Sequence, residues 1–96
     1  MKKNLLSFNL PVIITKQNKR FVAYTPALDV STSGKTAKEA KAHFVKLVNL
    51  FFEEVIEMGT VNDVLSELGW TKVQKKWAPP KVISSPFINM KVSAFV

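Results

Sequence analysis

Residues 20–40 read RFVAYTPALDVSTSGKTAKEA, and this stretch decides the fold. Its first part, residues 20–25, is rich in aromatic and β-branched side chains, which favour an extended strand. Pro26 ends that strand. Residues 28–33 predict a second, weaker strand, which Gly34 closes. The stretch therefore predicts two neighbouring strands that lead directly into the next element.

That next element is predicted to be a long amphipathic helix. Thr36 and Glu39 have the spacing of a capping box, in which the two side chains satisfy free backbone N–H groups at a helix start. Gly59 is the residue type that most often follows a helix end. At about 100° per residue, one broad core-facing stripe is expected. It consists of Ala40, Phe44, Leu47, Val48, Phe51, Val55 and Met58.

A short second helix is predicted almost without an intervening loop. Thr60 and Asp63 repeat the capping pattern, and Gly69 ends the segment. The apolar face of this helix would consist of Val61, Val64, Leu65 and Leu68. Two adjacent helices therefore follow the strands.

Strands are also predicted toward both ends of the chain. Residues 8–15 alternate in a period of two, with Pro11 indicating an edge or strand-start position, and residues 16–19 are predicted to form a turn. Residues 88–96 alternate as well. The sequence thus predicts an α+β fold: a three-stranded antiparallel sheet, a long and a short helix on one face, and one or two C-terminal strands.

A single domain spanning residues 1–96 is expected. Its last segment, residues 78–96, is predicted as the C-terminal strand segment, because prolines 79, 80 and 86 exclude a long helix there. No pair of helices is predicted in residues 71–96, so we expect no C-terminal DNA-binding module.

The composition excludes several kinds of site. The chain has 96 residues, 47% of them hydrophobic, no cysteine and one histidine. Disulfides, thiolate zinc sites, iron–sulfur clusters and cysteine nucleophiles are thereby excluded. The basic start Met1-Lys2-Lys3 resembles that of a signal peptide, but the apolar run behind it is broken and lacks a cleavage pattern. We therefore expect a cytoplasmic protein without a transmembrane helix.

The net charge of +7 is unevenly distributed. Residues 1–50 hold nine bases and two acids, residues 51–70 hold five acids and no base, and residues 71–96 hold five lysines and no acid. The five acids of the middle segment are Glu53, Glu54, Glu57, Asp63 and Glu67. Two basic flanks therefore enclose an acidic centre.

Few residues suggest catalysis. His43 lies off the predicted core stripe and one turn after Glu39, which favours a solvated pair over a catalytic dyad. Asp29 stands alone, so two-metal chemistry would lack its carboxylate cluster. Gly34-Lys35-Thr36 looks like the end of a phosphate-binding loop, but Asp29 occupies the position of the first glycine. We expect no catalytic residue, metal or cofactor.

The C-terminal lysines leave two interpretations open. Lysines 72, 75, 76 and 81 are flanked by Trp70 and Trp77, which could form a basic surface with stacking platforms for single-stranded nucleic acid. The alternative, which we favour, is an edge strand protected by lysines, with both tryptophans packed inward.

A second apolar set on the long helix predicts a further contact. Val45, Phe52 and Ile56 lie near about 140°, 120° and 160° on the helical wheel, outside the core stripe. Either the short helix or the C-terminal segment covers them, or a second copy of the chain does. We accordingly predict a homo-oligomer, a dimer or larger, with these residues in its interface.

The chain resembles a known family in its strand and helix-start motifs. Residues 21–29, then Gly34-Lys35-Thr36 and Glu39-Ala40, together with Leu65 to Trp70, resemble the HicB antitoxins of toxin–antitoxin systems, over about residues 8–77. The resemblance implies a degenerate ribonuclease-H-like fold without nuclease activity. It also implies binding to a small HicA ribonuclease toxin whose active site becomes occluded.

The expected function is therefore that of a non-catalytic HicB-like antitoxin, with the acidic residues 53, 54, 57, 63 and 67 attracting a basic toxin. Two alternatives remain: a small nucleic-acid-binding module that uses the basic flanks, and an oligomeric orphan domain of the same fold. We expect neither membrane binding nor direct DNA binding.

Overall fold

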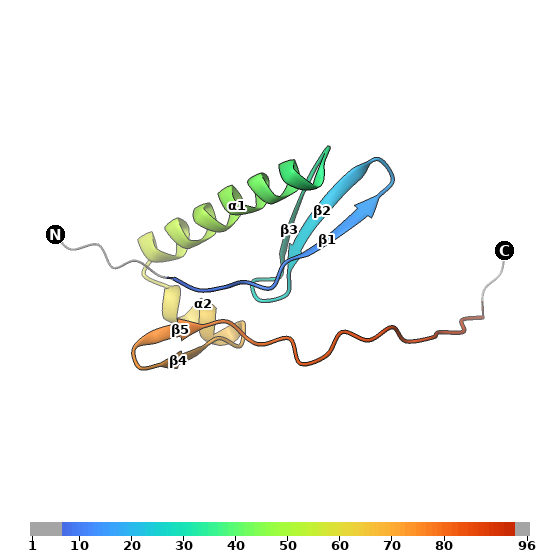
Figure 1. Cartoon of the computed structure of the whole chain (residues 1–96). Coiled ribbons are helices and arrows are strands. Elements are labelled where there is room, and N and C mark those ends of the chain that lie inside the picture. Colours follow the sequence, from blue (N-terminus) through green and yellow to red (C-terminus); the bar gives the residue numbers. More distant parts are fainter. Residues whose placement is uncertain (1–6, 94–96) are drawn as a thin grey trace.

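The computed structural model describes residues 7–93 and has the α+β organisation expected (Figure 1). Met1-Lys2-Lys3 and residues 94–96 lie outside the described residues. In chain order the elements are β1 (Ile13–Gln17), β2 (Arg20–Thr25), β3 (Val30–Gly34), α1 (Ala37–Glu57), α2 (Val61–Glu67), β4 (Thr71–Val73) and β5 (Lys76–Ala78).

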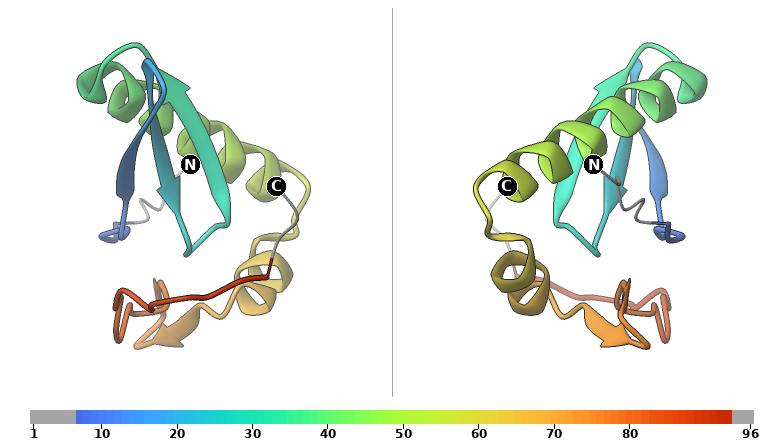
Figure 2. Two further views of the ribbon diagram at one scale, coloured as in Figure 1. Left: turned by 90° about the vertical axis from the view of Figure 1, so that its right-hand side faces the viewer. Right: turned by 90° about the vertical axis from the view of Figure 1, so that its left-hand side faces the viewer.

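The three-stranded sheet is antiparallel in the order β1-β2-β3. Because side chains alternate across a strand, Phe21, Ala23 and Thr25 of β2 face one side of the sheet. Helix α1 covers that side over β2 and β3 (Figure 2). Helix α2 packs instead against α1 and the loop between β2 and β3. The opposite face of the sheet carries no helix in the described part of the chain.

The predicted start of α1 is confirmed. Thr36 Oγ1 accepts a hydrogen bond of 3.0 Å from the Glu39 backbone N–H. The Glu39 carboxylate accepts one of 3.0 Å from the backbone N–H of Lys35, one residue before the cap. Gly34 is required for this close turn, because a Cβ there would lie 2.6 Å from the Ala40 nitrogen. The predicted end is also confirmed, since Gly59 follows α1 with a φ of 70°.

Two hydrophobic clusters form the core. The smaller one contains Ala23, Ala40 and Phe44, between the sheet and the first half of α1. The larger one joins the loop after β2, the second half of α1, α2 and the residue that follows it. Its buried members are Ala27, Leu28, Phe52, Val55, Leu65 and Trp70. Phe8 stacks against this cluster, with its ring centroid 5.2 Å from that of Phe52 and 5.0 Å from that of Trp70.

The strand boundaries differ from the prediction at the N-terminal side. The strand predicted over residues 8–15 begins only at Ile13 and runs to Gln17, so the turn is reduced to residues 18 and 19. Pro11 has no N–H to contribute to a ladder, and Phe8 and Leu10 pack against the clusters instead.

The third strand also starts later than predicted, at Val30. Asp29 has a φ of 54°, in the left-handed region, which breaks the extended conformation between Leu28, which is buried, and Val30, which is half-buried.

The core face of α1 includes most of the predicted stripe, since Ala40, Phe44 and Val55 are buried. The prediction is wrong for two residues. Phe52, assigned to an exposed interface, is only 8% exposed, whereas Met58, assigned to the core, is 68% exposed. Trp70 and Phe8 pack against Phe52 and so extend the buried side of the helix toward it.

The C-terminal region contains a hairpin and an extended segment. Strands β4 and β5 pair with each other through the two-residue turn Gln74-Lys75. The strand predicted over residues 88–96 is wrong for its described part, because residues 79–93 form no helix or strand. This segment, which we call the C-terminal arm, extends away from the body (Figure 1).

The arm makes the molecule elongated. Its radius of gyration is 16.6 Å and its extents are 60 × 28 × 21 Å. A compact chain of this length has a radius of gyration of about 12.5 Å. Among the described residues, no helix is long and apolar enough to cross a bilayer.

Candidate functional site

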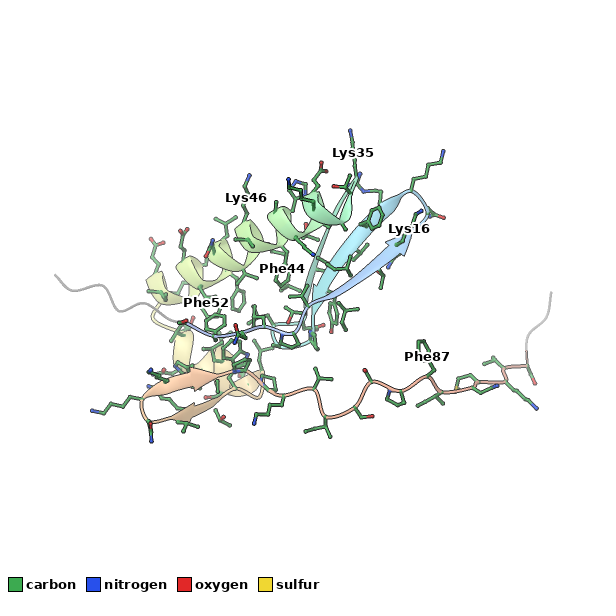
Figure 3. The ribbon with its side chains drawn as sticks, viewed as in Figure 1. Lys16, Lys35, Phe44, Lys46, Phe52 and Phe87 are labelled. Carbon is green, nitrogen blue, oxygen red and sulfur yellow. The ribbon has the colours of Figure 1, made fainter. Side chains whose placement is uncertain are left out.

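The five acids of the middle segment form the candidate site, which we call the acidic surface. Its members are Glu53, Glu54 and Glu57 on α1, and Asp63 and Glu67 on α2. All five are exposed. On α1 they lie opposite the buried side, since Phe52 and Val55 point into the larger cluster. Figure 3 shows Phe44 and Phe52 on the inner side of the helix and Lys46 on the outer side.

Among residues 7–93, these carboxylates make no hydrogen bond that holds the fold. Within residues 7–93 none of the five accepts a hydrogen bond, whereas Glu39 accepts one at the α1 cap and Asp29 accepts one from Tyr24. The α1 helix has no basic residue in its last turn, where Glu54 and Glu57 lie. A helix C-terminus carries partial negative charge, so acids there oppose the macrodipole. Their placement therefore costs helix stability.

The two residues considered for catalysis have structural partners. His43 Nδ1 lies 2.7 Å from the carbonyl oxygen of Ser33 in β3, so this nitrogen donates to the strand. The expected pairing of His43 with Glu39 is replaced by this bond and by the contact of Glu39 with the Lys35 N–H. In residues 7–93 no three His, Cys, Asp or Glu side chains are grouped in a way that could hold a metal ion.

The carboxylate of Asp29 is hydrogen-bonded to a tyrosine side chain. The Tyr24 hydroxyl donates a 3.1 Å hydrogen bond to Asp29 Oδ1. This bond, followed by desolvation and the negative charge of Asp29, raises the pKa of Tyr24 above its usual value. The left-handed backbone of Asp29, with its N–H bonded to the Thr25 carbonyl at 3.0 Å, places the carboxylate beside the strand.

The two tryptophans of the C-terminal region have different environments. Trp70 is 3% exposed, and its indole Nε1 donates a 2.8 Å hydrogen bond to the Ala27 carbonyl. The inward packing that we favoured is thus confirmed for Trp70. Trp77 is half-buried, and Lys72 Nζ lies 5.3 Å from its ring centroid. Lysines 72, 75, 76 and 81 are exposed on the hairpin and the arm.

Of the three apolar residues predicted to form an interface on α1, two are exposed and one is buried. Val45 and Ile56 are 58% and 57% exposed, as expected for an interface, but Phe52 belongs to the core. Two further apolar residues of this helix, Leu50 and Met58, are exposed on other sides.

A groove beside Val45 was not predicted from the sequence. It has a volume of about 330 Å³ and is lined by Ser7, Phe8, Leu10, Phe44, Val45, Val48 and Asn49. The segment before β1 therefore forms one wall and α1 the other. The alternation of residues 8–15 indicated that Phe8 and Leu10 are turned inward, but it could not indicate that they pack beside a helix rather than within a sheet.

Comparisons with protein-family models, with curated proteins and with solved structures found no match to this chain.

Proposed function

We propose that the chain is a non-catalytic, HicB-like antitoxin, which binds a small, basic HicA-type ribonuclease toxin and occludes its active site. The degenerate ribonuclease-H-like character of the fold is part of this proposal. It is supported by the order of elements, in which the motif residues of β2, the turn at Gly34 and the cap at Thr36 lead into one long helix and a short second helix.

The observation that carries the proposal is the position of the acidic surface. Glu54 and Glu57 lie in the last turn of α1, where negative charge is unfavourable by about 0.3–1 kcal/mol per residue. Neither residue has a hydrogen-bond partner within the described chain that offsets this cost. The carboxylates of Glu54 and Glu57 are therefore available to a positively charged partner.

The acidic surface would first attract a basic toxin, and the body of the protein would then cover the toxin's active site. The five exposed carboxylates lie on consecutive helices, and residues 51–70 contain no base, so this part of the chain attracts a basic protein. Such complementarity accelerates encounter and fixes orientation more than it adds affinity. Occlusion requires no chemistry from the antitoxin, only a body large enough to cover the toxin's cleft.

The test is rescue of growth in cells that express a HicA-type toxin. The triple variant Glu53→Lys, Glu54→Lys and Glu57→Lys should lose rescue, since it reverses the attraction. The same change should stabilise α1 slightly, because it places cations at the helix C-terminus. Loss of rescue with unchanged or raised thermal stability therefore reports on binding and not on folding.

A matched control lies on the same helix. Lys38, Lys41 and Lys46 are exposed on the first half of α1, and their reversal to glutamate changes the same number of charges. This control should retain rescue. Rescue that survives the acidic reversal would contradict the assignment of the acidic surface, and a wild-type chain that gives no rescue would contradict the antitoxin function.

A second candidate function, nucleic-acid binding, is favoured by the four exposed lysines at 72, 75, 76 and 81. It would use Trp77 as its stacking platform, because Trp70 is buried and hydrogen-bonded. Binding of single-stranded RNA should then weaken steeply with salt, and each lysine contact removed should reduce the salt slope by about 0.7. Tight RNA binding with this behaviour would favour the second function over the first.

A further inference from the structure

The C-terminal arm exposes an unusual amount of apolar surface. Phe87 is fully exposed at 105% and Ile83 is 90% exposed, and in Figure 3 the ring of Phe87 extends into open space. The other large apolar residues of the arm are Val82, Ile88, Met90 and Val92, which are 52–77% exposed. Contiguous apolar surface of this kind marks a contact that another surface covers.

The sheet has one edge that can accept such a segment. Both β1 and β3 are outer strands, but the two edges are not equivalent. At β3 the Ser33 carbonyl is already bonded to His43, and α1 packs closely along that strand. At β1 no strand pairs with the outer side in the described chain, so alternate backbone N–H and C=O groups remain available there.

The groove lies beside the segment that leads into β1. Its first wall is the segment Ser7 to Leu10, which leads into β1, and its second wall includes Val45 and Asn49 of α1. Helix α1 lies over β2 and β3, so the space beside β1 is only partly covered. Side chains from a strand added to β1 could therefore enter the groove and cover the exposed Val45.

The arm has one apolar and one polar face. On the helix side β1 presents Ile14 and Lys16, while on the other side it presents Ile13, Thr15 and Gln17. Residues 88–93 alternate in polarity. With Ile88, Met90 and Val92 turned toward the groove, Asn89, Lys91 and Ser93 would lie on the side of Thr15 and Gln17.

We propose that residues 87–93 of one chain add as a strand to the β1 edge of a second copy, with the apolar side chains of the arm in that copy's groove. Each copy has one arm and, on its three-stranded sheet, one edge that can accept it, so two copies can pair in a closed, two-fold exchange. A second copy is favoured over the chain's own arm, because that arm extends away from its body (Figure 1). This inference goes beyond the proposed function and stands independently of it.

The first test compares the two faces of the arm. Sedimentation equilibrium of the wild type should give the mass of two chains. Ile88→Asp with Val92→Asp should weaken dimerisation by at least about tenfold, because carboxylates would enter the groove. Asn89→Asp with Ser93→Asp adds the same charge to the same segment on the polar face and should leave the mass of two chains. A monomeric wild type, or equal effects of both pairs, would overturn the proposal.

The second test locates the receiving surface on α1. Val45→Asp should weaken the dimer, whereas Leu50→Asp should not, although the two residues are 58% and 61% exposed on the same helix. Both positions are exposed, so neither change should alter the circular dichroism of the fold. A dimer that is indifferent to Val45→Asp, or more sensitive to Leu50→Asp, would show that the arm does not occupy the groove.

Disulfide formation between introduced cysteines distinguishes an arm that adds to a second copy from an arm that folds back onto its own sheet. The chain itself has no cysteine that could interfere. A mixture of the single variants Thr15→Cys and Lys91→Cys should form a disulfide-linked heterodimer under mild oxidation. A mixture of Thr15→Cys and Lys46→Cys serves as the control and should not. If a bond forms only within one chain of the double variant Thr15→Cys and Lys91→Cys, the arm covers its own sheet and the exchange is wrong.

Discussion

At the scale of single residues, Trp70 connects distant parts of the chain. Its indole reaches the Ala27 carbonyl, 43 residues away in the sequence, and its ring packs against Phe8 and Phe52. The sequence predicted that this tryptophan packs inward, from the general tendency of aromatic side chains to be buried. It could not identify Ala27 as the partner, because nothing local relates a loop carbonyl to a residue that follows the second helix.

We expect Trp70→Phe to lower the free energy of unfolding by about 1–3 kcal/mol, because the Ala27 carbonyl would be left buried without its donor. Urea denaturation followed by circular dichroism measures this change. Trp77→Phe is the matched control and should cost less, because Trp77 is half-buried and its indole makes no hydrogen bond within residues 7–93. Equal costs for both variants would contradict the importance of the Ala27 bond.

The hydrogen bond between Tyr24 and Asp29 predicts a pH dependence. The pKa of Tyr24 is raised above its usual value, mainly because its hydroxyl donates to Asp29. Since the folded pKa exceeds the unfolded one, the stabilisation is fully present below about pH 10 and is lost as the pH rises through the folded pKa.

Absorbance titration can follow this group alone, because Tyr24 is the only tyrosine of the chain. We expect a midpoint above the usual value in the wild type, and a return toward that value in Asp29→Asn. Asp63→Asn removes a carboxylate remote from Tyr24 in the sequence and should leave the midpoint unchanged. A wild-type midpoint at or below the usual value would contradict the observed bond.

At the scale of elements, the local signal for the start of α1 was reliable, whereas the strand predicted near the C-terminus was not. The start of α1 was predicted because Thr36, Glu39 and Gly34 act within one turn of each other. The strand over residues 88–96 was predicted from polarity alternation alone. Alternation shows that a segment suits a sheet edge, but it does not identify the strand with which the segment pairs.

The β4–β5 hairpin escaped prediction because its turn lacks the usual residues. Gln74 and Lys75 have φ values of 51° and 65°, a left-handed pair typical of a type I′ turn, for which Asn-Gly is preferred. The left-handed backbone conformation is sterically unfavourable for both residues. The sequence Gln-Lys therefore carried no turn signal.

Relieving this cost should stabilise the protein. We expect Lys75→Gly to raise the free energy of unfolding by up to about 1 kcal/mol, the difference between the left-handed penalty and the flexibility that glycine adds to the unfolded chain. Urea denaturation measures it, since Trp77 couples the hairpin to the larger cluster. Lys72→Gly, within β4, should instead destabilise. A loss of stability in Lys75→Gly would contradict the turn geometry.

At the scale of the whole molecule, the sequence shows how charge is distributed, but it does not show that part of this charge destabilises a helix. The acidic segment could be counted directly, and the structure adds that Glu54 and Glu57 oppose the dipole of α1. The assignment of Phe52 to an interface was wrong because a helical wheel describes one helix without its neighbours. Phe8 and Trp70, on either side of α1 in the sequence, decide which side of that helix is inside.

The division of the core into two clusters also sets an order of events during synthesis. All members of the smaller cluster have been added to the chain by residue 48, whereas the larger one lacks Leu65 and Trp70 until 22 residues later. At about 5–20 residues per second, this interval lasts about 1–4 s. Throughout it Ala27 and Leu28 lack the partners that cover them, so a ribosome that pauses in this region would leave the larger cluster incomplete while the smaller one already has all its members.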